Sequence, residues 1–329
     1  MAIKRYNNTQ FIQPIAVEKI DFTKVSYVTV DIEHAGQRID NFLIKHLKGV
    51  PRSHLYRFIR KGEVRINERR ARASSRIYEG DNLRIAPIRI SQRPRKIQPS
   101  AQKKDHLNDQ ILYEDDEILV IDKPSGIAVH GGSGVAHGVI ETIRATHQNQ
   151  KYIELVHRLD RDTSGCLIMA KKRSVLTKLQ KDMFYNKIKK SYCALVKGLW
   201  PKTTKMVSAP LLKNHLSSGE RIVRVDSRGK ESITRVNLVN YFSESSLLDI
   251  QLVTGRTHQI RVHCQFVGHP IAGDLKYGDK NFNTKLKVNG LKRLFLHANQ
   301  LNFKHPRSGK HLKITAKLPK PLENLLESI

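Results

Sequence analysis

The hydrophobic pattern of this chain changes on either side of residues 91–110. Before this stretch, apolar residues recur at helical spacing, whereas from Ile111 onward they alternate with polar residues as in half-buried strands. Residues 91–110 show no periodicity and are rich in Gln, Lys, Pro and Ser, a composition typical of a semi-flexible linker. A chain of 329 residues has room for about two domains. We therefore expect two domains joined by a linker over 91–110.

The first domain is expected over residues 33–90, after a polar N-terminal extension over 1–32 that contains one possible strand, VSYVTV, and to which we assign no function. Two short amphipathic helices are predicted in RIDNFLIKHL and PRSHLYRFIRKG, and two small strands in GEVRINERR and GDNLRIAP. This pattern resembles the RNA-binding domain first known from ribosomal protein S-four, over about residues 36–88.

The charge of the chain indicates a polyanionic partner. Lys and Arg number 59 against 30 Asp and Glu, which gives a net charge of +29. Residues 38–96 alone hold 17 Lys or Arg and 5 Asp or Glu, a net +12. Nucleic acid is the leading partner and an anionic membrane surface the second. The RNA-contacting residues expected on the second helix, off its apolar stripe, are Arg52, Arg57, Arg60 and Lys61. The alternative is a solvated basic face without a ligand.

Several classes of protein are disfavoured. No apolar run approaches the ~20 residues of a spanning helix, and the N-terminus lacks a signal-peptide pattern, so we expect a cytoplasmic protein without membrane insertion. Cys166, Cys193 and Cys264 lie far apart, which fits reduced thiols rather than a disulfide framework or a metal knuckle.

The second domain is expected over residues 111–329. Its predicted strands outnumber its helices and do not alternate with them regularly, which favours an α+β fold around a mixed, largely antiparallel sheet. Neither a G-x-G-x-x-G nor a G-x-x-x-x-G-K-[ST] loop is present, so dinucleotide-binding and P-loop folds are not supported.

The segment HRLDRDTSG, residues 157–165, carries the strongest chemical signal. It sets Asp160 and Asp162 among Arg158, Arg161 and His157, and nearby cations favour the ionised, nucleophilic form of a carboxylate. The alternative is a turn whose Asp, Thr and Ser side chains bond to local backbone.

The motifs on either side of this segment favour the catalytic interpretation. The motifs VIDKPSGIAVHGG, HRLDRDTSG, KSYCALVKG, TGRTHQIRVH, GHPIAGDLKYG and FLHANQLNFKHP follow one another in this order. Together they resemble the RluA family of pseudouridine synthases over essentially all of residues 111–329. The resemblance implies the pseudouridine synthase fold and the conversion of uridine to pseudouridine in RNA, with large-subunit rRNA as substrate. It also implies a monomer that needs no cofactor and no metal.

The resemblance also assigns roles to single residues. Asp160 matches the catalytic aspartate, which attacks the ribose, attacks the uracil ring or removes a ribose proton. Arg261 matches the arginine that pairs with it, and Tyr192 the tyrosine that stacks on the uracil, although without the family Tyr192 reads as ordinary core. Arg158 matches the arginine that enters the RNA stack when the base is extracted. Arg256, like His258, is either a phosphate contact or loop scaffolding.

Three alternatives are set against this interpretation. His258, His263 and His269 suggest a zinc site, but no H-E-x-x-H motif or Cys pair accompanies them. A metal-dependent nuclease requires clustered acidic ligands, and only EDDE at 114–117 resembles such a cluster, where a solvated turn is the simpler interpretation. A non-catalytic rRNA-binding or assembly factor has no need of the Asp160, Tyr192 and Arg261 set.

Overall fold

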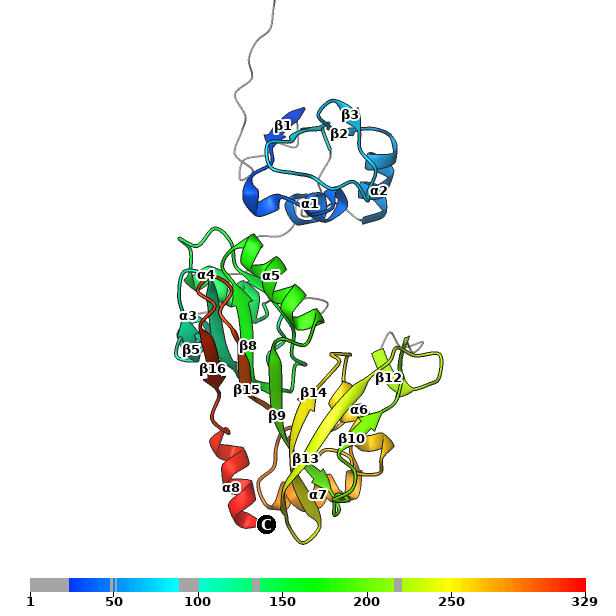
Figure 1. Ribbon diagram of the computed structural model, residues 1–329, viewed down its shortest axis with the longest axis vertical. Helices are drawn as coiled ribbons and strands as arrows, with labels where there is room; N and C mark the ends of the chain where they lie inside the picture. The colour runs from blue at the N-terminus through cyan, green and yellow to red at the C-terminus, as the bar shows by residue number, and fades with distance from the viewer. Residues whose placement is uncertain (1–23, 48–49, 51, 89–100, 132–136, 216–220) are drawn as a thin grey trace, which may run out of the picture. The chain divides into compact units, whose positions relative to one another are not determined.

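A computed structural model describes residues 24–47, 50, 52–88, 101–131, 137–215 and 221–329 of the chain (Figure 1). Its contacts divide it into two units, Met1–Ile97 and Gln98–Ile329. This division falls inside the stretch for which the sequence predicts a linker. The sequence predicts an extension over 1–32 and a linker over 91–110. Of these segments, residues 1–23 and 91–100 lie outside the described residues.

The first unit is a four-stranded sheet packed against two short helices. The elements are β1 (Ser26–Thr29), the 3₁₀ turn η2 (Ile32–His34), α1 (Ile39–His46), α2 (Arg52–Arg60), β2 (Val64–Ile66), β3 (Arg69–Arg70) and β4 (Asn82–Ile85). The strand order is β1-β4-β2-β3, and all of the pairs are antiparallel. The apolar stripes of the two helices form the core with the strands, as their spacing predicts; Phe42, Leu43 and Leu55 are almost completely buried.

Strand β1 corrects the expected start of this domain. It lies within the segment predicted as an extension over 1–32, yet it pairs with β4 along its whole length. Val28 and Val30 are buried in the core of the unit. A domain this small needs every apolar strand it has to bury enough surface, which is why a short segment in a polar region joins the sheet.

The second unit is built on a ten-stranded sheet, which confirms the predicted mixed, largely antiparallel architecture. Eight strands follow one path in the order β10-β13-β14-β9-β15-β8-β6-β5, while β16 pairs with β15 and β7 with β8. Only the β15–β8 pair is parallel among the described strands. The strands are β5 (Ile111–Glu114), β6 (Ile118–Lys123), β7 (Glu154–Leu155), β8 (Ser164–Ala170), β9 (Lys189–Lys197), β10 (Met206–Ser208), β13 (Ile233–Tyr241), β14 (Ser245–Leu252), β15 (Leu296–Lys304) and β16 (His311–Thr315). A separate hairpin is formed by β11 (Leu211–His215) and β12 (Arg221–Val225).

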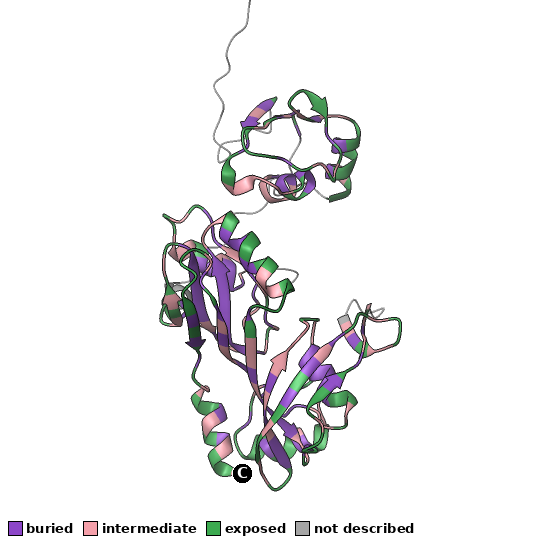
Figure 2. Ribbon diagram, in the orientation of Figure 1, coloured by how far each residue is buried: buried purple, intermediate pink, exposed green. Residues whose placement is uncertain are grey.

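The centre of this sheet is buried on both faces. The strand period of two sends Leu167 and Met169 of β8 into one apolar cluster and Ile168 and Ala170 into another. Figure 2 shows the resulting run of buried strand residues. The helices of the unit are α3 (Ala101–Asn108), α4 (Val139–Thr146), α5 (Arg173–Phe184), α6 (Gln259–Phe266), α7 (Lys280–Val288) and α8 (Lys320–Ser328). Helix α4 contributes to the first cluster and α5 to the second.

Helix α3 shows that the linker prediction is wrong for residues 101–108. Its sequence AQKKDHLN has no amphipathic pattern, so nothing in its periodicity predicts a helix. Leu107 is nevertheless 2% exposed and joins the core cluster to which α4 contributes. The packing of Leu107 in the core thus stabilises a helix that the periodicity of its own sequence does not predict.

No helix among the described parts of the chain is long and apolar enough to cross a membrane.

Candidate active site

One pocket of the second unit, about 380 Å³ in volume, collects the three catalytic residues expected from the sequence. Asp160 comes from the loop between β7 and β8, Tyr192 from β9 and Arg261 from the first turn of α6. Arg158 and Arg256 line the same pocket. Residues separated by about 100 positions in the chain therefore face a common space.

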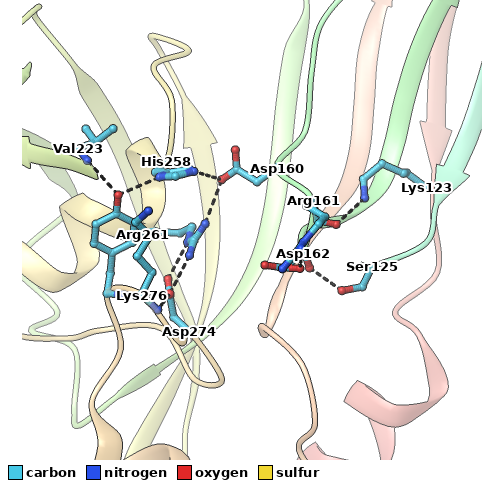
Figure 3. A network of polar contacts seen from close by, with 11 residues as sticks. Lys123, Ser125, Asp160, Arg161, Asp162, Val223, His258, Arg261, Asp274 and Lys276 are labelled. Carbon is cyan, nitrogen blue, oxygen red and sulfur yellow. Dashed lines mark hydrogen bonds and ion pairs between the residues drawn. The ribbon is translucent and has the colours of Figure 1, made fainter. Parts of the chain in front are cut away.

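The turn after β6 forms hydrogen bonds with the loop that carries Asp160 (Figure 3). The ammonium of Lys123, which is fully buried, donates to the carbonyl of Arg161 at 3.0 Å and also to the carbonyls of Pro124 and Ile127. Ser125 Oγ donates to the carbonyl of Asp162 at 2.7 Å. Three backbone carbonyls use all three donors of the ammonium, although burial lowers the pKa of Lys123 to about 7. The turn at DKPSG thus holds the loop that carries Asp160 in place.

Two further contacts fix the end of this loop. Gly165 has a φ of 110°, and a Cβ at this position would lie 2.3 Å from the carbonyl oxygen of Ala298 on β15. Only glycine permits this approach of two backbones. His157 accepts a hydrogen bond on Nε2 from the backbone N–H of Ile168 at 3.2 Å, and burial lowers its pKa to about 3. His157 is therefore a neutral structural histidine.

Arg261 is held in a fork between two carboxylates. Its Nε and Nη2 donate to the two oxygens of Asp274 at 2.7 and 2.8 Å, while its Nη1 faces Asp160 Oδ2 at 3.5 Å. The side chain of Asp274 is completely buried and also accepts the N–H groups of Lys276 and Tyr277. Burial alone raises the pKa of Asp274, but the hydrogen bonds and charge of Arg261 outweigh it and lower that pKa below its ordinary value. The bidentate pair fixes the guanidinium plane and directs its remaining edge toward Asp160.

Tyr192 lies near the middle of β9, opposite Ile250 of β14, and is 6% exposed. Burial raises the pKa of its phenol, and the negative charge of Asp160 raises it further. The phenol therefore stays protonated at neutral pH. Tyr192 is one of the residues that line the pocket.

The remaining predicted contact residues lie on the surface. Arg158 is exposed at the pocket, and Arg256, also exposed, donates from Nε to the carbonyl of Glu231 at 3.1 Å. In the first unit, α2 exposes its cations on the side away from the core, as its sequence predicts; these are Arg52, Arg57 and Arg60, with Lys61 following the helix.

Two residues that line or support the pocket were not predicted from the sequence. Asp274 stands in GDLKYG, a motif recognised only as part of the family resemblance, and no local pattern reveals that its carboxylate meets Arg261. Lys190 lines the pocket two positions before Tyr192 on the same face of β9, and burial lowers its pKa. The K-x-Y spacing at alternate strand positions is the signal that predicts a shared face.

The histidines considered for zinc each have a separate protein partner. His258 Nδ1 contacts the hydroxyl of Tyr277, His263 lies between Thr234 Oγ1 and the Ala209 carbonyl, and His269 Nδ1 donates to the Lys197 carbonyl. Among the residues that the structure describes, no group of three potential ligands converges on a metal position.

The acidic run at 114–117 forms the turn between β5 and β6, as the sequence favoured, with Glu114 and Asp116 exposed, but the turn is only partly solvated. Glu117 is buried, and it accepts hydrogen bonds from Lys172 and Arg307. Asp115 accepts the backbone N–H of Ile118, and Glu114 pairs with Lys171. These carboxylates are bound to cations and backbone of the domain, which explains their clustering without a metal.

Comparison with known protein families identifies the class of protein to which this sheet and its aspartate–arginine pair belong. Residues 117–266 match the profile described as RNA pseudouridylate synthase, and residues 37–83 match the S4 domain. The chain belongs to the RNA pseudouridine synthase family, as the sequence motifs predicted.

Particular relatives extend the match over nearly the whole chain. The chain is 51% identical to "Ribosomal large subunit pseudouridine synthase C" of Salmonella typhi, over 94% of this chain and 98% of the relative. Identity to the protein of the same name from Escherichia coli strain K12 is 50%, over 94% and 98%. Among solved structures, "Human RNA Pseudouridylate Synthase Domain Containing 4" matches with a TM-score of 0.55 and 26% identity, over 69% of this chain and 95% of that one.

Proposed function

We propose that this protein isomerises specific uridines of large-subunit rRNA to pseudouridine, with Asp160 as the catalytic carboxylate. The observation that carries the proposal is the pocket in which Asp160, Arg261 and Tyr192 meet. The names of the relatives support large-subunit rRNA as the substrate, and they favour an enzyme over a non-catalytic rRNA-binding factor.

The reaction cuts the bond from the ribose to uracil N1 and joins the same ribose carbon to uracil C5. The C5 proton leaves and N1 gains one, so the change is an isomerisation without oxidation or reduction. Asp160 acts on the sugar or the base, Arg261 orients its carboxylate, and Tyr192 stacks on the extracted uracil. Arg158 enters the RNA stack in place of the base, because extraction costs a few kcal/mol and leaves a gap.

We assign further RNA binding to Arg256 at the pocket and to the exposed cations on and just after α2, namely Arg52, Arg57, Arg60 and Lys61. The N-terminal unit in which α2 lies provides a positively charged face, and phosphate contacts supply affinity without sequence information. The protein acts as a monomer in the cytoplasm, and its chemistry uses side chains alone.

The test uses large-subunit rRNA transcribed with uridine that carries tritium at C5. Tritium is released only when C5 is joined to the ribose, so the purified protein should release it in proportion to pseudouridine formed. A small-subunit rRNA transcript serves as the matched control. Equal release from both transcripts would contradict the proposed substrate, and no release from either would contradict the proposed reaction.

A further inference from the structure

A second side chain besides Arg261 faces the catalytic carboxylate. His258 Nε2 lies 3.8 Å from Asp160 Oδ2, and it approaches the same oxygen as Arg261 (Figure 3). This distance is about 1 Å longer than a hydrogen bond, and catalytic contacts are often long in the absence of substrate and shorten in its complex.

The tautomer of His258 follows from the contacts on its other side. The phenol oxygen of Tyr277 accepts the backbone N–H of Val223 at 3.0 Å and lies 2.8 Å from His258 Nδ1. Among the described contacts of this hydroxyl, Nδ1 is the acceptor available to its single hydrogen. With Tyr277 as the donor to Nδ1, the imidazole proton is on Nε2, the nitrogen that faces Asp160.

The backbone holds His258 in an uncommon conformation. Its φ is 55°, in the left-handed region, immediately before α6. Gln259 fixes this turn from inside the domain: its Oε1 accepts from Thr254 Oγ1 and from the Arg256 N–H, and its amide donates to the Ile233 carbonyl. Uncommon backbone conformations persist where the surroundings determine them fully and cluster at functional sites.

Charged groups surround His258 on several sides. Asp160 and Asp274 favour its protonated form, whereas Arg261 and Lys276 oppose it, and burial lowers its pKa more than any of these. The imidazole is therefore neutral at and above neutral pH. A neutral Nε2–H is a donor that directs a carboxylate without adding a second positive charge beside Arg261.

We propose that His258 is a positioning residue that aligns the Asp160 carboxylate through Nε2–H, and that its tautomer is set by Tyr277, whose hydroxyl also accepts the backbone N–H of Val223 on hairpin β11–β12. The inference rests on the proposed catalytic role of Asp160. It also links the hairpin to the active site, because Val223 lies on β12 and packs with Tyr277 and with Val262 of α6.

The experiment compares Tyr277→Phe with wild type and with Tyr241→Phe. Tyr277→Phe removes one hydroxyl and keeps the ring that lies 5.0 Å from the Arg261 guanidinium carbon. Tyr241→Phe removes a hydroxyl that donates to the Trp200 carbonyl, outside the residues that line the pocket, and is the matched control. The measurements are single-turnover tritium release at saturating enzyme, RNA affinity, and the pH dependence of the rate.

We expect Tyr277→Phe to slow single turnover roughly tenfold, as the loss of one oriented hydrogen bond does, with RNA affinity within about twofold of wild type. The acid limb of its pH profile should move to higher pH, because the lost O–H donor had favoured neutral imidazole. A rate equal to that of Tyr241→Phe, or an unmoved acid limb, would overturn the inference.

A second pair of variants covers the case in which Tyr277→Phe fails to fold. His258→Gln keeps a neutral N–H donor and should be faster than His258→Ala; equal rates would show that a donor is not what matters. Asp160→Asn is measured alongside. If Asp160→Asn retains turnover, the proposed function of Asp160 fails, whereas an inactive Asp160→Asn with fully active His258 and Tyr277 variants refutes this inference alone.

Discussion

Arg261 and Asp274 form a bidentate ion pair in which both partners are buried, with N–O distances of 2.7 and 2.8 Å. Removing one partner of such a pair leaves an uncompensated charge, which costs about 3–5 kcal/mol. Asp274→Asn should therefore lower the free energy of unfolding by about that amount and misalign Arg261 at Asp160. The exposed Lys285–Glu244 pair provides the control, because Glu244→Gln should cost less than about 1 kcal/mol. Equal losses of unfolding free energy in Asp274→Asn and Glu244→Gln, measured by denaturant titration, would contradict a stabilising role for the buried pair.

The same pair has a defined dependence on pH. The folded-state pKa of Asp274 lies below its ordinary value of 3.8, so its stabilising contribution is fully present above pH 4 and disappears as pH falls toward the folded pKa. The difference in unfolding free energy between wild type and Asp274→Asn should thus be constant from pH 5 to 8 and shrink below about pH 4. If the difference in unfolding free energy grew as the pH fell, the pKa of Asp274 would not be lowered in the folded state.

Asp160→Asn should abolish pseudouridine formation, with a loss of at least about 10³-fold, because removing a member of a catalytic unit costs this much or more. The substitution adds no bulk, so RNA affinity should change little. Asp162→Asn is the matched control two positions along the same loop; the Asp162 carboxylate contacts Arg161 rather than Arg261. Tritium release measures the rate and filter binding the affinity. Substantial turnover by Asp160→Asn would remove it from the mechanism.

The sequence was sufficient for most of the fold, because helices and strands depend on patterns that lie close together in the chain. The residues proposed as catalytic, Asp160, Tyr192 and Arg261, lie far apart in the chain; their roles were assigned through the family motifs, and the structure brings them to one pocket. Helices α1 and α2 and the strands after them follow from apolar spacing, and Asp160 from its motif. Asp274 and helix α3 were not predictable in this way. The role of Asp274 arises only when the fold brings it to Arg261, and α3 is stabilised by the packing of Leu107 rather than by its own periodicity.

Activity should survive EDTA and exhaustive dialysis. The histidines considered as zinc ligands, and disfavoured, from the sequence have hydroxyl or carbonyl partners in the protein, and the sequence has no metal-ligand motif. Tritium release before and after chelation measures this directly. Loss of turnover that zinc or magnesium restores would require a metal in the mechanism.

Replacing Arg52, Arg57 and Arg60 of α2, together with Lys61 just after it, with glutamine should weaken RNA binding and flatten its dependence on salt. Each lost phosphate contact reduces the slope of log affinity against log salt by about 1, so the slope should fall by up to about 4. Single-turnover rates at saturating enzyme should stay near wild type, since the pocket lies in the other unit.

The control for this variant carries four lysine-to-glutamine changes on the exposed surface of the second unit, at Lys304, Lys310, Lys313 and Lys317. It loses the same formal charge and should keep the wild-type slope. Equal slopes in the two quadruple variants would show that charge alone, rather than the position of α2, governs binding.

The parallel pairing of β8 with β15 has a consequence for the order in which the protein is made. Ser164 and Gly165, just after the catalytic loop, lie opposite His297 and Ala298 near the other end of the chain. Synthesis proceeds from the N-terminus and domains fold as they emerge, so the basic unit ending at Ile97 is complete while that partner strand is still untranslated. On the proposed function, a nascent chain binds RNA before it has a pocket in which to isomerise a uridine.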